Sequence, residues 1–227
     1  MRGLRGEEML TAWDRCRATV EPRRALALLE LAAPEIPAQT LLDLPLSRRD
    51  ALLLKARALT FGPRMEGFAI CPDCASPLEF GMDSTLFLDG LEATPEQDAT
   101  GARPANTADI LASMEAPDEP RAQAILLSRT LGVEPPAEGA IPTEWVERFE
   151  SLNSASEIRI QLECAACGGR PVLDLDVVRF FAREIGAAAK RLLREIHTLA
   201  SAYGWSETSI AAMGEMRRAA YLEMLDA

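Results

Sequence analysis

The sequence predicts an α+β fold that is mainly helical, with a small antiparallel β ribbon split in two by a helical insertion. Two Cys-x-x-Cys motifs, which begin at Cys71 and at Cys164, each lie between short extended apolar runs and predict the ribbon. Elsewhere apolar residues recur every three or four positions, the period of an amphipathic helix. Prolines, glycines and N-cap residues divide these periodic stretches into separate helices.

These patterns divide the chain into five successive segments. The ribbon halves lie on either side of the insertion, and helices lie outside both halves. The predicted segments are residues 1–65 for the N-terminal helices, 66–89 for the first half of the ribbon, 90–156 for a loop and the helical insertion, 157–175 for the second half, and 176–227 for a long helix followed by a helical hairpin.

Three helices are predicted in the N-terminal segment. The first carries Cys16, which has no partner motif and which we expect to be a small, half-buried apolar residue. Pro22 opens the second helix, because a proline at the first helical position loses no hydrogen bond. Ser47 and Asp50 resemble an N-cap and a capping-box acid for the third, which Gly62 ends.

Arg48 and Arg49 fall in the first turn of that third helix, where the helix dipole disfavours positive charge. We therefore expect acidic groups to face them. Those groups belong either to this acid-rich chain, as intramolecular salt bridges, or to the surface of a partner protein.

The paired cysteines predict a structural zinc site formed by Cys71, Cys74, Cys164 and Cys167. Two Cys-x-x-Cys motifs supply the four thiolates of a tetrahedral zinc shell. Compact ribbons separate their motifs by about 15–20 residues. The longer gap here is tolerable because the cost of loop closure grows only logarithmically with length. The competing interpretation is thioredoxin-like redox chemistry, but both motifs precede strands rather than helices.

The remaining helices follow from capping signals and apolar spacing. We expect a loop over residues 90–106, Thr107 as the cap of the next helix, and Asp118 at the start of another. The longest helix begins near Asp176 and has Gly204 as its C-cap. Ser206 caps a short helix that precedes the final one.

The C-terminal helices contain a predicted docking element. Large side chains with polar groups dominate many protein interfaces, and such side chains cluster here: Trp205, Arg217, Arg218 and Tyr221. The alternative is that the aromatic residues pack on the long helix while the arginines pair with acids such as Glu215. The two interpretations differ in whether these side chains are exposed.

Charge and cysteine content restrict the possible functions. The formal net charge is −11 and the pI is near 4.7, so we do not expect binding to nucleic acid, which requires a basic surface. Five cysteines, four of them assigned to zinc, favour a reducing compartment. No signal peptide or membrane span is evident, and we expect a soluble protein of the cytoplasm. His197, the one histidine, has no nucleophile or carboxylate placed beside it, so we expect no enzymatic activity.

Three stretches in this order resemble the T-even-type baseplate hub and hub-assembly chaperone group of contractile phage tails and related injection systems. They are Leu44–Asp50 leading to Phe61 and Gly62, the two cysteine motifs, and Leu199–Glu207 running to Arg217–Leu222. The resemblance implies a non-enzymatic component or chaperone of the baseplate hub. It implies hub, spike or tail-tube proteins as partners and no small-molecule substrate. It also implies that the chain lies either free in the bacterial cytoplasm or within an assembled tail or injection particle.

A second hypothesis is a zinc-ribbon regulator that binds nucleic acid, which the acidic charge disfavours. A third is an enzyme with a structural zinc. Four cysteine ligands would leave no coordination position open for a substrate, which argues against metal catalysis.

Overall fold

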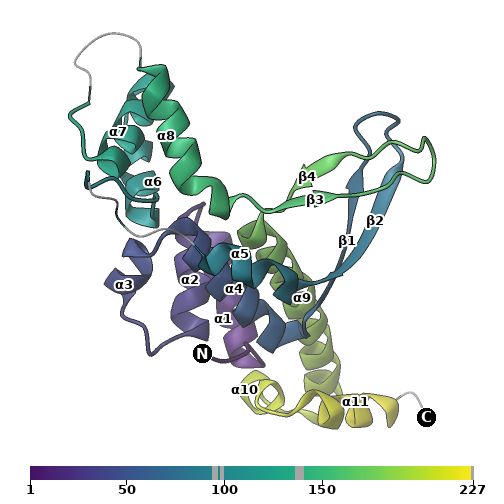
Figure 1. The fold of residues 1–227 in the computed structure, drawn as a ribbon. Coiled ribbons are helices and arrows are strands. Elements are labelled where there is room, and N and C mark those ends of the chain that lie inside the picture. The colour runs from purple at the N-terminus through teal and green to yellow at the C-terminus, as the bar shows by residue number, and fades with distance from the viewer. Residues whose placement is uncertain (94–96, 98–99, 136–140, 226–227) are drawn as a thin grey trace.

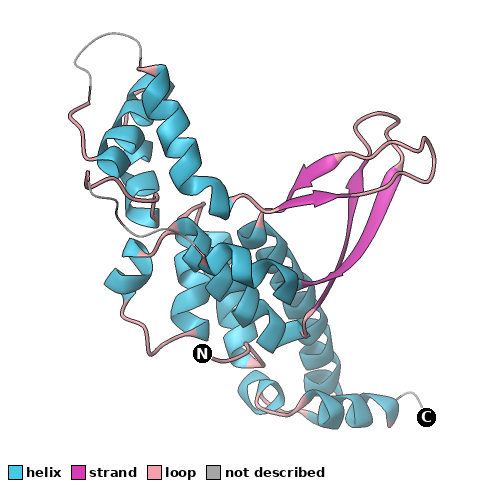
Figure 2. Cartoon of the chain, viewed as in Figure 1, coloured by secondary structure: helices cyan, strands magenta, loops and turns pink. Residues whose placement is uncertain are grey.

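The computed structural model describes residues 1–225 except for 94–96, 98–99 and 136–140. It is mainly helical with two small antiparallel sheets, which confirms the predicted fold class (Figures 1 and 2). In chain order the elements are α1 Glu7–Ala18, α2 Arg23–Ala32, α3 Ala38–Asp43, α4 Leu46–Phe61, β1 Arg64–Ile70, β2 Pro77–Asp83, the 3-10 helix η1 Ser84–Phe87, α5 Leu88–Glu92, α6 Thr107–Met114, α7 Glu119–Leu131, α8 Thr143–Asn153, the 3-10 helix η2 Ser154–Ser156, β3 Arg159–Gln161, β4 Val172–Asp174, α9 Val177–Tyr203, α10 Glu207–Ala211 and α11 Glu215–Glu223.

The main core lies among α1, α2, α4 and α9 (Figure 1). The apolar residues of α9, at three- and four-residue spacing, face this core, and Phe181, Ile185 and Leu199 are fully buried. An ion pair between Arg57 and Glu184 joins α4 to α9, with 2.6 Å between guanidinium and carboxylate. Helix α9 is therefore held to the other core helices by apolar packing and by a partly buried ion pair.

Several predicted helix ends are confirmed. The Asp176 side chain accepts a hydrogen bond from the backbone N–H of Arg179 and caps α9, which ends at Gly204 with a φ of 69°. Ser206 caps α10 and Asp118 caps α7 in the same way. Side-chain caps satisfy backbone N–H groups that have no partner within the helix.

Two predicted caps are wrong. Helix α4 begins one residue before Ser47, its N-cap is Pro45, and no side chain caps it. The capping box lies instead at α6, where Asn106 and Asp109 bond to each other's backbone N–H, so Thr107 is inside the helix. Helix α3 was not predicted, because its six residues are too few to show a helical period.

Each half of the ribbon is a two-stranded antiparallel hairpin. Strands β1 and β2 pair from Arg64 opposite Asp83 to Ile70 opposite Pro77. Strands β3 and β4 pair over three residues each. The two hairpins extend together away from the helical body, and their loops lie side by side at the far end (Figure 1). Strand β1 begins at Arg64, before the predicted boundary at residue 66, and α5 reaches into the predicted loop of residues 90–106.

Helices α6, α7 and α8 form a lobe with a small core of its own (Figure 1). Leu127 and Leu131 of α7 are buried there against the apolar face of α8. At the base of the lobe Asp109 is fully buried between two arginines, Arg103 at 2.6 Å and Arg129 at 2.9 Å. The lobe meets the body at the start of α4, where the backbone N–H of Leu46 donates to the carbonyl of Ala105.

None of the helices in the described ranges is both long enough and apolar enough to cross a membrane.

Candidate metal centre

The structure brings together the four cysteines that the sequence predicts as ligands. The loop between β1 and β2 carries Cys71 and Cys74, and the loop between β3 and β4 carries Cys164 and Cys167. Their sulfurs all lie within 4.8 Å of one another. Elsewhere in the described ranges no other group of three or more cysteine, histidine or acidic side chains is close enough to hold a metal ion.

The sulfur geometry fits a single tetrahedral ion. The Sγ atoms of Cys71 and Cys167 are 3.8 Å apart, and those of Cys74 and Cys164 are 3.6 Å apart. A zinc ion with Zn–S bonds of about 2.3 Å requires tetrahedral edges of about 3.8 Å. Both short distances join one loop to the other. An ion at the centre would therefore connect two parts of the chain that are distant in sequence.

The two cysteine turns, residues 71–75 and 164–168, share two backbone features. In each turn the carbonyl of the first cysteine accepts a hydrogen bond from the residue four positions later, which is Ala75 at 2.9 Å or Gly168 at 2.8 Å. Those two residues also share a left-handed backbone, with φ of 58° and 71°. Glycine adopts this conformation readily at position 168, whereas Ala75 adopts it with a Cβ atom.

The turns also approach each other closely. A Cβ atom placed on Gly169 would lie 2.7 Å from the carboxylate of Asp73 and 3.2 Å from the sulfur of Cys167. Asp73 belongs to the first turn and Gly169 follows the second. A larger residue here would have to displace the exposed Asp73 side chain and would press on the Cys167 sulfur, so the constraint at Gly169 is one of space, in contrast to the backbone requirement at Gly168.

The pKa values of two of the four thiols move in opposite directions. Hydrogen bonds from Ser76 lower the pKa of the exposed Cys74 thiol to about 6. The backbone N–H of Gly169 lowers the pKa of Cys167, but contacts with the sulfurs of Cys164 and Cys74 outweigh it and raise the pKa to about 12. Neighbouring sulfurs resist becoming thiolates together. A cation among them would remove that conflict, since its charge stabilises every thiolate at once.

Apolar packing beneath the site is slight. The ribbon's own cluster contains Leu78 and the two buried cysteines, with Leu162 and Leu173 partly buried against it. So few apolar side chains bury too little surface to hold two hairpins together, and small domains of this kind are commonly stabilised by a metal.

The fifth cysteine lies outside the site. Cys16 is buried in the main core, and burial raises the pKa of its thiol to about 11. A thiol that stays protonated is a poor nucleophile and a poor metal ligand. The exposed His197 lies on α9, away from the four cysteines.

Arg48 and Arg49, at the start of α4, differ in burial. Arg49 is buried, binds its neighbour Asp50 at 2.7 Å and donates to the hydroxyl of Thr107 at 3.4 Å. It connects α4 to the lobe and pairs with this chain's own Asp50, so for Arg49 the intramolecular alternative holds and the partner-facing alternative is corrected. Arg48 is half-buried beside it.

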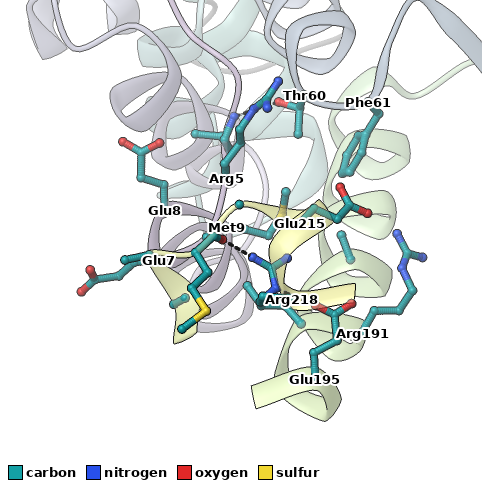
Figure 3. Close-up of a pocket in the computed structure, with 18 residues that line it drawn as sticks. Arg5, Glu7, Glu8, Met9, Thr60, Phe61, Arg191, Glu195, Glu215 and Arg218 are labelled. Carbon is teal, nitrogen blue, oxygen red and sulfur yellow. Dashed lines mark hydrogen bonds and ion pairs between the residues drawn. The ribbon is translucent and has the colours of Figure 1, made fainter. Parts of the chain in front are cut away.

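The two arginines of the predicted C-terminal docking element also differ in burial. Arg218 is buried and donates to Glu195 at 2.7 Å and to the carbonyl of Met213. It lies in the wall of an open pocket of about 640 Å³ between the N-terminal segment, α9 and the turn before α11 (Figure 3). Arg217 is exposed. Burial removes Arg218 from the predicted surface and gives it a role in attaching α11 to α9.

The aromatic residues of this region stack on each other. The rings of Tyr203 and Trp205, on either side of the left-handed Gly204, are stacked with centroids 4.6 Å apart and 16° between their planes. Tyr221 of α11 meets Trp205 edge-on at 4.8 Å. The three rings join α9 to α11, and Trp205 and Tyr221 remain partly exposed.

One set of charged residues was overlooked in the sequence. Arg179, Arg183, Lys190 and Arg194 lie on the exposed side of α9, opposite its buried face. The same helical period that predicts the apolar face of α9 also places these four charged residues on one face.

No family model matches the chain, and comparisons with curated proteins and with solved structures also find no match.

Proposed function

We propose that this chain is a non-enzymatic assembly protein whose ribbon is held together by one structural zinc ion. The observation that carries the proposal is the four-sulfur site, which joins two hairpins separated by the entire helical lobe. Four protein ligands fill a tetrahedral shell, so a bound ion would have no position for a substrate or an activated water. Such an ion stabilises the fold and performs no chemistry.

Zinc is the ion that this ligand set supports best. Four thiolates in a tetrahedral arrangement select zinc or iron. Zinc does not change oxidation state, and it suits a site whose role is to connect two hairpins. Metal analysis distinguishes the two, because zinc leaves the protein colourless whereas an iron–thiolate centre absorbs visible light.

We further propose that the protein works in the baseplate hub of a contractile phage tail or related injection system, as a component or as an assembly chaperone. The resemblance in the cysteine motifs, the start of α4 and the C-terminal helices supports this assignment. The aromatic contacts around Gly204 add a physical reason for the Tyr-Gly-Trp motif, since those residues form the joint between the last helices.

Deleting the gene in its native host and isolating the tail particles tests this role. The proposal predicts tails that lack a complete hub, and it predicts that tagged protein purifies with hub, spike or tail-tube proteins. Normal, infective or contractile particles from the deletion strain would contradict it. A zinc-ribbon regulator of nucleic acid remains the alternative, and it predicts instead a salt-dependent shift of DNA or RNA.

A further inference from the structure

The exposed side of α9 carries a row of cations, which we call the α9 basic face. Its members are Arg179, Arg183, Lys190 and Arg194, all exposed. With about 100° of rotation per residue, the four positions fall within an arc of about 60°. From the first to the last they extend over about 22 Å of the helix. Ala187 lies between Arg183 and Lys190 on the same face, so the centre of the row is low and open to a close approach.

These cations have no acidic partner among the described residues. No ion pair or hydrogen bond joins the side chains of Arg179, Lys190 or Arg194 to another part of the described chain. Arg183 instead lies over the ring of Phe68 at 4.9 Å. Two pairs in the row are four residues apart, a spacing at which like charges repel each other on a helix.

The acids of the same helix are used elsewhere. Glu184 and Glu195 are the only acidic residues within α9, and both turn toward the body. Glu184 binds Arg57, and Glu195 binds Arg218. The helix therefore uses its two partly buried acids for internal contacts, and the side that carries the row has no acid of α9, although the whole chain has a net charge of −11.

We propose that the α9 basic face is a docking surface for an acidic α-helical segment of a partner protein. A helix that lies along α9 can place a carboxylate opposite each cation, because both helices have the same rise per residue. Phe68 of β1 is 57% exposed at the Arg183 end of the row. The partner segment accordingly carries one apolar side chain beside its acids, to cover that ring.

A protein segment fits this surface better than nucleic acid. The four cations form a narrow row, with Arg191 the one exposed cation of α9 outside it, and the ribbon surface beside Phe68 also carries Glu66 and Glu79, both exposed. Phosphate binding draws on a broad positive field, and the overall charge of this chain opposes one. The proposal depends neither on the metal nor on the baseplate assignment, since it rests only on the charges of α9.

Binding of a synthetic probe tests the proposal on the full chain. The probe is a labelled alanine- and glutamine-based helix that carries four Glu at the spacing of the four cations and one Leu at the end. A second peptide has the same composition with its Glu spread around the helix, and a duplex DNA oligonucleotide is the third ligand. Fluorescence anisotropy is measured at about 0.05 M and about 0.5 M salt, where surface charges are weakly and strongly screened.

Two variants with the same net charge separate the effect of the α9 basic face from that of overall charge. One changes Arg179, Arg183, Lys190 and Arg194 to Gln, and the control changes the exposed Arg2, Arg15, Arg23 and Arg217 to Gln. Circular dichroism and an unfolding transition establish that both are folded. We expect the matched peptide to bind more tightly than the spread peptide, and the α9 variant to bind it at least about tenfold more weakly. The control variant should bind like the unchanged protein.

Three results would overturn the proposal. The first is tighter binding of DNA than of the matched peptide, which would assign the face to nucleic acid. The second is equal weakening by both variants, which would show a response to net charge alone. The third is no binding of the matched peptide at the lower salt concentration.

Discussion

Among single residues, the two cysteine turns share a backbone requirement that only one of them meets with glycine. Gly168 and Ala75 occupy the same position of the turn and both have a left-handed backbone. A residue with a Cβ atom in that conformation costs about 1–2 kcal/mol. The Cβ of an alanine at position 168 would touch nothing within 4 Å, so any cost there comes from the backbone alone.

Exchanging the two residue types therefore gives a paired prediction. Gly168→Ala should lower the free energy of unfolding of the metal-loaded protein by about 1 kcal/mol, after allowance for the lower entropy of the unfolded chain. Ala75→Gly should not lower it. Denaturant titration of both variants measures the difference, and a Gly168→Ala protein as stable as the original would show that the turn is not held in this conformation.

The second prediction concerns Asp109, the buried carboxylate at the base of the lobe. Burial raises the pKa of this carboxyl, but hydrogen bonds from Arg103 and Asn106 and the charge of Arg103 outweigh burial and leave the pKa lowered. Asp109→Asn should destabilise the lobe by about 1–3 kcal/mol, the usual result of removing one hydrogen-bonding partner at a buried position, because water can reach the partly exposed Arg103 and Arg129 that lose the carboxylate. Exposed Glu144→Gln, on α8, should change stability by less than about 0.5 kcal/mol.

The lowered pKa also sets the direction of the pH dependence. The stabilisation is fully present above the ordinary pKa of an aspartate, about 3.9, and is lost as the pH falls through the lower pKa of the folded state. Helix content followed by circular dichroism should therefore show that acid unfolds the original lobe, while Asp109→Asn is less stable already at neutral pH. Equal stability of the two proteins at pH 7 would be the contrary result.

For the secondary-structure elements, the attachment of α11 depends on one of two adjacent arginines. Arg218→Ala leaves the carboxylate of Glu195 without its partner and should cost about 1–3 kcal/mol. Arg217→Ala, one residue earlier, removes an exposed side chain and should change stability by less than about 0.5 kcal/mol. Thermal unfolding of the two variants measures this contrast, and equal effects would mean that α11 is not attached through Arg218.

The elements also show what the sequence could predict. Long periodic helices such as α9, caps such as Asp176 and Gly204, and the four cysteines follow from local pattern and spacing. The burial of Arg49 and Arg218 does not, because their partners, Thr107 and Glu195, are placed by tertiary packing. The predicted cap at Ser47 is wrong for a similar reason. The first residue of α4, Leu46, bonds through its backbone N–H to Ala105 of the lobe, and the local sequence carries no signal for that contact.

At the scale of the whole molecule, the ribbon and the lobe should respond differently to loss of the metal. The lobe has its own apolar core and is anchored to α4, whereas the ribbon has few buried apolar side chains. Chelation should therefore raise hydrogen exchange in residues 64–83 and 159–174 far more than in α6 and α7. Uniform loss of protection across lobe and ribbon would indicate that they unfold as one unit.

The metal content of freshly purified protein is the most direct test of the four-sulfur site. Elemental analysis with a thiol count should find one zinc per chain, and the same content after Cys16→Ser. Cys71→Ser or Cys164→Ser should abolish tight binding, since each removes a buried ligand of the site. Well under one equivalent of zinc in protein whose thiols are intact, with no other metal in its place, would contradict the account.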